Sequence, residues 1–161
     1  MQQLIHALKN IPEYVSMLET LGKNRSAAIT GIGQINRSHL IAGLYRDTGR
    51  PIVVLCQDDM AAKRLQAELQ AFLGETAPVL PSRELTLYDS AVVSRSWEQK
   101  RLRQLYDLAQ GSSHLQIMSW EALSMRTMPP QVLQSAAFSL RIGQEYVLED
   151  LLTQLSWFMM H

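Results

Sequence analysis

The stretch that decides the expected fold covers residues 26–44, SAAITGIGQINRSHLIAGL. A short apolar run comes first, a glycine-containing turn follows, and an apolar helix completes the unit. Residues 31–38 can be compared with G-x-x-x-x-G-K-[ST], the pattern of loops that hold phosphate groups on their backbone N–H donors. The frame of a phosphate-binding loop is therefore present in this sequence.

Half of the fixed positions of that pattern are changed. Gly31 and Ser38 match the first glycine and the final hydroxyl, whereas Asn36 replaces the second glycine and Arg37 replaces the lysine. Arg37 keeps the positive charge, but its guanidinium is larger and planar, so it is a poor substitute for a compact ammonium. We expect a degenerate loop without a bound nucleotide. Gly31 and Gly33 then serve the backbone geometry, Asn36 caps the helix, and Arg37 makes surface or interdomain contacts.

The rest of the chain alternates between strand and helix patterns. Residues 51–56, PIVVLC, form a continuous apolar run with β-branched residues, which is typical of a strand covered on both faces of a parallel sheet. Further strands are expected at residues 26–30, 77–80 and 114–118, and helices at 60–73, 96–109 and 120–126. This order predicts a three-layer α/β domain with a parallel sheet, related to nucleotide-binding motor domains.

Three regions are expected along the chain. Two short helices around Pro12 form a lead-in over residues 1–25, and the α/β domain covers residues 26–135. A strand at residues 136–142 and a helix reaching Leu155 would open a second α/β unit over residues 136–161. The apolar tail at 156–161, SWFMMH, suggests that this second unit is truncated.

Composition limits the classes of function. The 161 residues include 15 basic and 15 acidic side chains, so general affinity for a polyanion is not expected. No apolar run is long enough to cross a bilayer, and a cytoplasmic location without membrane contact is expected. The single cysteine, Cys56, excludes an internal disulfide and fits an inert core residue better than a catalytic thiol.

Metal and hydrolase chemistry have little support. The four histidines are scattered, without a pair at i, i+3 or i, i+4, and no G-x-S-x-G motif occurs. Asp58 or Asp59 after the 51–56 strand resembles an acidic magnesium ligand, but an aspartate at this position already has a sufficient role as a helix cap. No metal, catalytic residue or cofactor is therefore assigned.

Two groups of residues are candidates for interaction. In the long polar loop at 81–94, Tyr88 and Asp89 are either a recognition pair or a tyrosine packed under its own loop beside a turn-forming aspartate. The following helix carries a basic cluster that would either contact phosphate or form a solvated helix face with neighbouring acids. The members of this cluster are Arg95, Lys100, Arg101 and Arg103.

Four segments in order point to a family. They are the degenerate loop at 31–38, PSRELTLYDS at 81–90, RSWEQKRLRQLYDL at 95–108 and MSWEALSMRTMPP at 118–130. Together they resemble the N-terminal region of the bacterial transcription-repair coupling factor, Mfd, over about residues 26–155. The resemblance implies a RecA-like first domain, similar to that of the nucleotide-excision repair protein UvrB, which has lost ATP hydrolysis, followed by the start of a domain that recruits UvrA.

The resemblance also implies partners for the parent protein. UvrA, RNA polymerase, DNA bound by a later motor domain, and intramolecular contacts with other domains are expected. The basic residues that contact UvrA in this family lie beyond the present chain and are not carried over. The expected function is a non-catalytic scaffold in transcription-coupled DNA repair. The alternatives are an atypical nucleotide-binding ATPase that uses Arg37, and a DNA-contacting module that uses the basic cluster.

Overall fold

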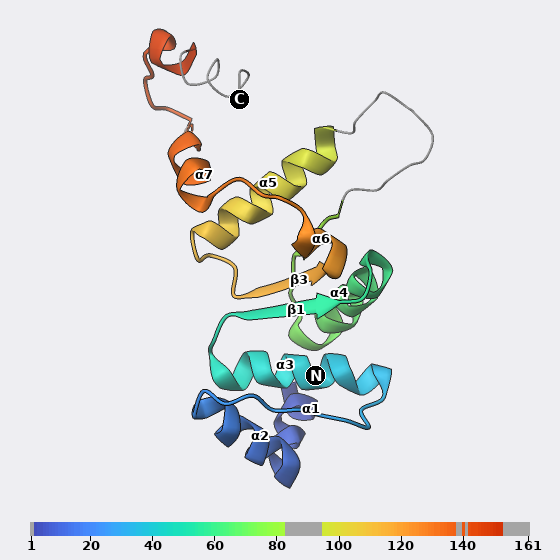
Figure 1. Cartoon of the computed structure of the whole chain (residues 1–161). Helices are drawn as coiled ribbons and strands as arrows, with labels where there is room; N and C mark the ends of the chain where they lie inside the picture. The colour runs from blue at the N-terminus through green and yellow to red at the C-terminus, as the bar shows by residue number, and fades with distance from the viewer. Residues whose placement is uncertain (1, 83–94, 138–139, 141, 153–161) are drawn as a thin grey trace, which may run out of the picture.

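The computed structural model describes residues 2–82, 95–137, 140 and 142–152. Within these residues, helices lie on both sides of a small parallel sheet (Figure 1). The expected mixed α/β class with a parallel sheet is confirmed. The RecA-like type of fold and the division into domains stay predictions.

The lead-in consists of short helices, as predicted. They are α1 (Gln2–Ala7), the 3-10 helix η1 (Leu8–Asn10) and α2 (Pro12–Gly22). Pro12 occupies the first turn of α2, where its missing N–H costs no hydrogen bond. Leu8, Tyr14 and Met17 are buried and pack against α3 (Gln34–Thr48), which therefore lies between the lead-in helices and the sheet (Figure 1).

The predicted strand at residues 26–30 is wrong. These residues are exposed and belong to no strand, and they run along α3 on the side of the lead-in helices rather than beside the sheet (Figure 1). An apolar run forms a strand only where a neighbour offers backbone partners, and α3 separates this run from the sheet. The predicted Asn36 cap is also wrong, because α3 begins at Gln34 with Gly33 as its N-cap.

The sheet consists of β1 (Ile52–Cys56), β2 (Val79–Leu80) and β3 (Leu115–Ser119) in the order β1-β3-β2. Both pairings are parallel, and Ile52 lies opposite Leu115. β3 is central, and all of its residues are buried. The predicted strands at 51–56 and 114–118 are confirmed to within one residue, and that at 77–80 is reduced to two residues.

Four further helices follow α3 along the chain, ahead of the helical residues 148–152. They are α4 (Asp59–Leu73), α5 (Arg95–Ala109), α6 (Trp120–Ser124) and α7 (Pro130–Ala136). The predicted aspartate cap is confirmed at Asp58, whose side chain accepts a hydrogen bond from Ala61 N at 2.7 Å, and Ser119 likewise accepts one from Ala122 N at 3.1 Å. Local capping chemistry therefore places the starts of α4 and α6.

The two faces of the sheet are covered unequally. α4 contacts all three strands, and α3 and α4 share the largest cluster of buried side chains with β1 and β3. On the other face, Leu105 of α5 packs against Leu80 and Met118. β1 lies beyond this cover, so Val53 is 61% exposed and Leu55 43% exposed. The prediction that the 51–56 strand is covered on both faces is therefore wrong.

The elements predicted for a second unit fall only partly within the described residues. α7 ends at Ala136, and no described residue between 137 and 142 belongs to a strand, so the predicted strand at 136–142 is wrong for the residues that can be compared. Residues 148–152 are helical, in agreement with the expected helix there. The apolar tail at 156–161 lies outside the described residues.

Candidate functional site

The glycines of the degenerate loop have different roles. Gly31 has a φ of +78°, a left-handed conformation that strains any residue with a Cβ atom. Gly33 is extended, and its carbonyl accepts the first hydrogen bond of α3 from Asn36 N at 3.0 Å. The turn therefore requires glycine at position 31 in particular. Asn36 lies exposed in the first turn of the helix.

The two remaining template positions are placed differently from each other. Arg37 is exposed on α3. Ser38 is 1% exposed, and its hydroxyl donates to the Ile35 carbonyl at 2.9 Å. A hydroxyl at this position of a working loop would bind the magnesium ion, whereas the Ser38 hydroxyl is buried and bonded within its own helix.

A polar network closes the carboxyl edge of the sheet, the end at which β1, β2 and β3 finish. Asp59 begins α4, and its Oδ2 accepts hydrogen bonds from the Ser82 hydroxyl at 2.6 Å and from Ser82 N at 3.3 Å. Ser119, at the end of β3, is fully buried beside it. The acidic residue that sequence alone left as a possible magnesium ligand is therefore engaged by the chain that follows β2.

The network also sets the charge of Asp59. Burial alone would raise the pKa of this carboxyl, but the hydroxyls of Ser119 and Ser82, Ser82 N–H and the Lys63 ammonium together lower the pKa below its ordinary value. Asp59 is thus ionised at neutral pH. A carboxylate held by hydroxyl and amide donors can fix the backbone at Ser82 in place.

Arg101 completes this network from α5. It is 5% exposed, and its guanidinium donates to the Pro81 carbonyl at 2.8 Å and to the Ala122 carbonyl at 3.0 Å. Trp97 Nε1 also donates to the Ser82 carbonyl. These bonds tie β2, α5 and α6 together. Burial lowers the pKa of Arg101, although not enough to neutralise a guanidinium.

The predicted basic cluster is therefore divided. Arg101 is buried, so its assignment to a phosphate-contacting or solvated face is wrong, because two backbone carbonyls occupy its donors. Lys100 and Arg103 are exposed, and Arg103 Nε pairs with Asp107 Oδ2 at 3.1 Å. The side chain of Arg95 lies outside the described residues, as do Tyr88 and Asp89.

Cys56 has the environment of a core thiol. It is half-buried against the cluster shared by the sheet, α3 and α4. Burial, together with the nearby Asp58 charge, raises the pKa of the thiol, which lowers the fraction of reactive thiolate at neutral pH.

Among the described residues, no group of three or more His, Cys, Asp or Glu side chains could hold a metal ion. None of the helices formed by those residues is long and apolar enough to cross a membrane.

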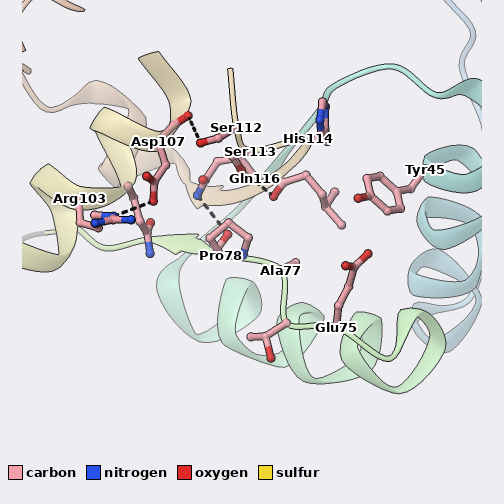
Figure 2. A pocket seen from close by; sticks show the side chains of 13 residues that line it. Tyr45, Glu75, Ala77, Pro78, Arg103, Asp107, Ser112, Ser113, His114 and Gln116 are labelled. Atoms are coloured by element: carbon pink, nitrogen blue, oxygen red, sulfur yellow. Dashed lines mark hydrogen bonds and ion pairs between the residues drawn. The ribbon is translucent and has the colours of Figure 1, made fainter. Parts of the chain in front are cut away.

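Two hollows open on the surface. One, of about 1070 Å³, lies between the lead-in helices and residues 27–32, so Gly31 and Asn36 face it rather than the carboxyl edge of the sheet. The other, of about 580 Å³, lies at the opposite, amino edge of the sheet and is lined by polar groups from α5 and β3 (Figure 2). Sequence reasoning missed both hollows, because only the tertiary structure brings their lining segments together.

Comparison with known proteins gives one distant relative. A transcription-repair-coupling factor from Myxococcus xanthus is 26% identical over 150 residues, which cover 88% of this chain. The same residues cover 12% of the relative, so the chain spans a small part of that protein's length. No protein-family model matches the chain, and no solved structure matches it at a significant level. The match supports a distant relationship to transcription-repair coupling factors.

Proposed function

We propose that this chain is a non-catalytic interaction module of a transcription-coupled DNA repair factor. The similarity to the Myxococcus xanthus protein and the resemblance of four segments to the N-terminal region of such factors support this assignment. The parent protein would couple the removal of stalled RNA polymerase to the recruitment of UvrA, with DNA bound through its own motor domain. Nucleotide turnover would belong to that motor and not to this module.

The closed carboxyl edge of the sheet is the main support for a non-catalytic role. In open α/β folds, ligands bind outside the carboxyl ends of parallel strands. Here Asp59 is bound by Ser82, and Arg101 by the Pro81 and Ala122 carbonyls. Asp59 Oδ2 and the Arg101 guanidinium are thus engaged in holding the scaffold together. Occupation of this edge by a nucleotide would break those bonds.

The loop supports the same conclusion independently. Ser38 is bonded within its helix, and Asn36 occupies the position at which a phosphate-binding loop has a glycine. Arg37, at the position of the phosphate-binding lysine, is exposed on the surface of α3. The inherited loop therefore serves as the turn into α3.

Titration calorimetry with ATP and Mg²⁺ tests the absence of nucleotide binding. We expect no saturable heat with the 161-residue chain. Micromolar binding with release of phosphate would contradict the proposal and favour the ATPase alternative, in which Arg37→Ala should abolish the activity. A DNA titration at rising salt separates the remaining alternative, because binding through phosphate contacts falls steeply with salt.

The role in repair has a separate test. Deleting the gene that encodes the parent protein should remove the preference for repair of the transcribed strand over the non-transcribed strand after ultraviolet damage. An unchanged strand preference in the deletion strain would refute the role in transcription-coupled repair, whatever the nucleotide titration shows.

A further inference from the structure

The hollow at the amino edge of the sheet has the features of a ligand site. It lies between the start of β3, the chain before β2, one side of α5 and the end of α3 (Figure 2). Arg103, Asp107, Ser112 and Gln116 lie toward one end of this view, and Tyr45, Glu75 and His114 toward the other. Its volume of about 580 Å³ is in the range of small-molecule sites.

Gln116 provides a hydrogen-bond acceptor without a donor. It is 1% exposed, and its Nε2 donates to the Pro78 carbonyl at 3.1 Å and to the Ile117 carbonyl at 2.9 Å. These two acceptors fix the orientation of the amide, because a flipped amide would place three oxygens together. Oε1 of Gln116 then has no partner among the described residues, and the same is true of Gln104 Oε1. Buried acceptors of this kind are rare in folded proteins.

The serines of the lining are also left as acceptors. The Ser112 hydroxyl donates to the Asp107 carbonyl at 2.8 Å, and the Ser113 hydroxyl donates to the Leu115 carbonyl at 3.3 Å. Each hydroxyl proton is thereby used, and the oxygen lone pairs remain. The hollow is consequently rich in acceptors, which selects a ligand with several N–H or O–H donors.

The charges of the lining favour a cation. Two carboxylates, Glu75 and Asp107, are present with one guanidinium, Arg103. Arg103 Nε pairs with Asp107 at 3.1 Å, whereas Glu75 has no ion-pair partner among the residues that the structure describes. The Tyr45 side chain lies on the Glu75 side of the hollow (Figure 2).

We infer that this hollow binds a small organic cation with several N–H donors, of the aliphatic polyamine class. One ammonium group would pair with Glu75 beside Tyr45, and a second donor would reach the unpartnered oxygens of Gln116 and Gln104. The site lies at the opposite edge of the sheet from Asp59 and does not depend on the proposed repair function. A free polyamine and a lysine side chain of another protein share this chemistry.

Titration calorimetry with spermidine on the whole chain tests the inference. We expect one saturable site, weakened about tenfold by Glu75→Gln and by Gln116→Leu, because each removes a group that the cation needs. Glu98→Gln is the matched control, since it removes the same charge from an exposed position on α5 outside the hollow. The spermidine affinity of this variant should stay within about twofold of that of the unmutated chain, because an exposed distant charge is screened.

Several outcomes would overturn the inference. Heat that never saturates, or an equal loss of affinity in Glu75→Gln and Glu98→Gln, would show non-specific attraction only. Tighter binding of inorganic phosphate than of spermidine would reverse the assigned charge preference. If Gln116→Leu does not fold, Asp107→Asn replaces it and should also weaken spermidine. A lysine-containing peptide and its acetylated form provide the last comparison. Equal, saturable binding of the two peptides would exclude recognition of an ammonium group. Tighter binding of the unmodified peptide than of spermidine would identify a protein side chain as the source.

Discussion

Replacing Gly43 by alanine tests how the lead-in helices pack on α3. Gly43 lies in the middle of α3 and is buried beneath η1 and α2. A Cβ atom at this position would overlap Leu8 Cδ1, and it would lie 2.9 Å from the Tyr14 hydroxyl oxygen. Tyr14 cannot move freely, because its hydroxyl donates to Asp47 Oδ2 at 2.9 Å and its side chain is buried.

The sign of the effect follows from two opposing terms. Alanine in a helix interior is more favourable than glycine by about 1 kcal/mol. Overpacking a buried contact costs about 1–3 kcal/mol. With Leu8 7% exposed and Tyr14 4% exposed, neither neighbour can turn into solvent without losing its own packing. We expect Gly43→Ala to lower the free energy of unfolding by about 1 kcal/mol, which corresponds to a fall in Tm of about 2–4 °C.

Urea and thermal unfolding followed by circular dichroism measure this change. Gly22→Ala is the matched control, because Gly22 ends α2 and no atom lies within 4 Å of the place its new Cβ would take, so it should be neutral or stabilising. Leu8→Ala should relieve the overlap, so the double variant should show a coupling above about 0.5 kcal/mol. A rise in Tm for Gly43→Ala would refute the observed packing of η1 and α2 on α3, because an uncovered helix gains from alanine.

Three further predictions concern the carboxyl edge and the loop. The pKa of Asp59 is lowered in the folded state. Its contribution to stability is therefore full above the ordinary aspartate pKa of about 4 and is lost as the pH falls through the lower folded value. Urea midpoints measured between pH 6 and pH 2 should fall less steeply in Asp59→Asn. Arg101→Met leaves the Pro81 and Ala122 carbonyls without donors and should cost about 1–3 kcal/mol in urea unfolding. Arg37→Ala changes an exposed side chain and should alter the free energy of unfolding by less than about 0.5 kcal/mol, with unchanged heats in an ATP titration.

Each of these predictions has a control or a contradicting result. Parallel pH profiles for the parent chain and Asp59→Asn would show that this carboxyl does not hold Ser82. Lys100→Met, at an exposed position next to Arg101, removes the same charge and should stay within about 0.5 kcal/mol of the parent chain. An equal loss in both variants would mean that Arg101 acts through net charge. An ATP-dependent heat that is lost in Arg37→Ala would be evidence that the loop binds a nucleotide.

The sequence was informative where structure depends on neighbouring residues. Asp58 and Ser119 cap helices because a side-chain oxygen reaches an N–H group three residues ahead. Gly49 and Gly74 end helices in the left-handed conformation, which glycine adopts without steric cost. The apolar runs that became β1 and β3 were also recognisable, since they contain no competing helical period.

Predictions from sequence were wrong where a segment's structure depends on which other segment packs against it. Residues 26–30 have the composition of a strand, but they lie on the far side of α3 from the sheet and have no strand beside them. Val53 and Leu55 have the composition of a doubly covered strand, yet α5 covers only β2 and β3 on their face. The composition of a segment indicates which side chains it can bury, whereas the tertiary arrangement decides whether another segment packs against them.

For the candidate sites, the sequence determined the types of residue and the tertiary structure determined their availability. Arg101 and Arg103 belong to one basic run, but the rotation of α5 against the sheet buries the first on backbone carbonyls and leaves the second exposed. Gln116 is an ordinary polar residue within a strand, and only the approach of α5 and the chain before β2 leaves its oxygen without a donor. Helix caps and turns are decided within a few residues of sequence, whereas burial and unmet hydrogen bonds arise only when distant segments meet.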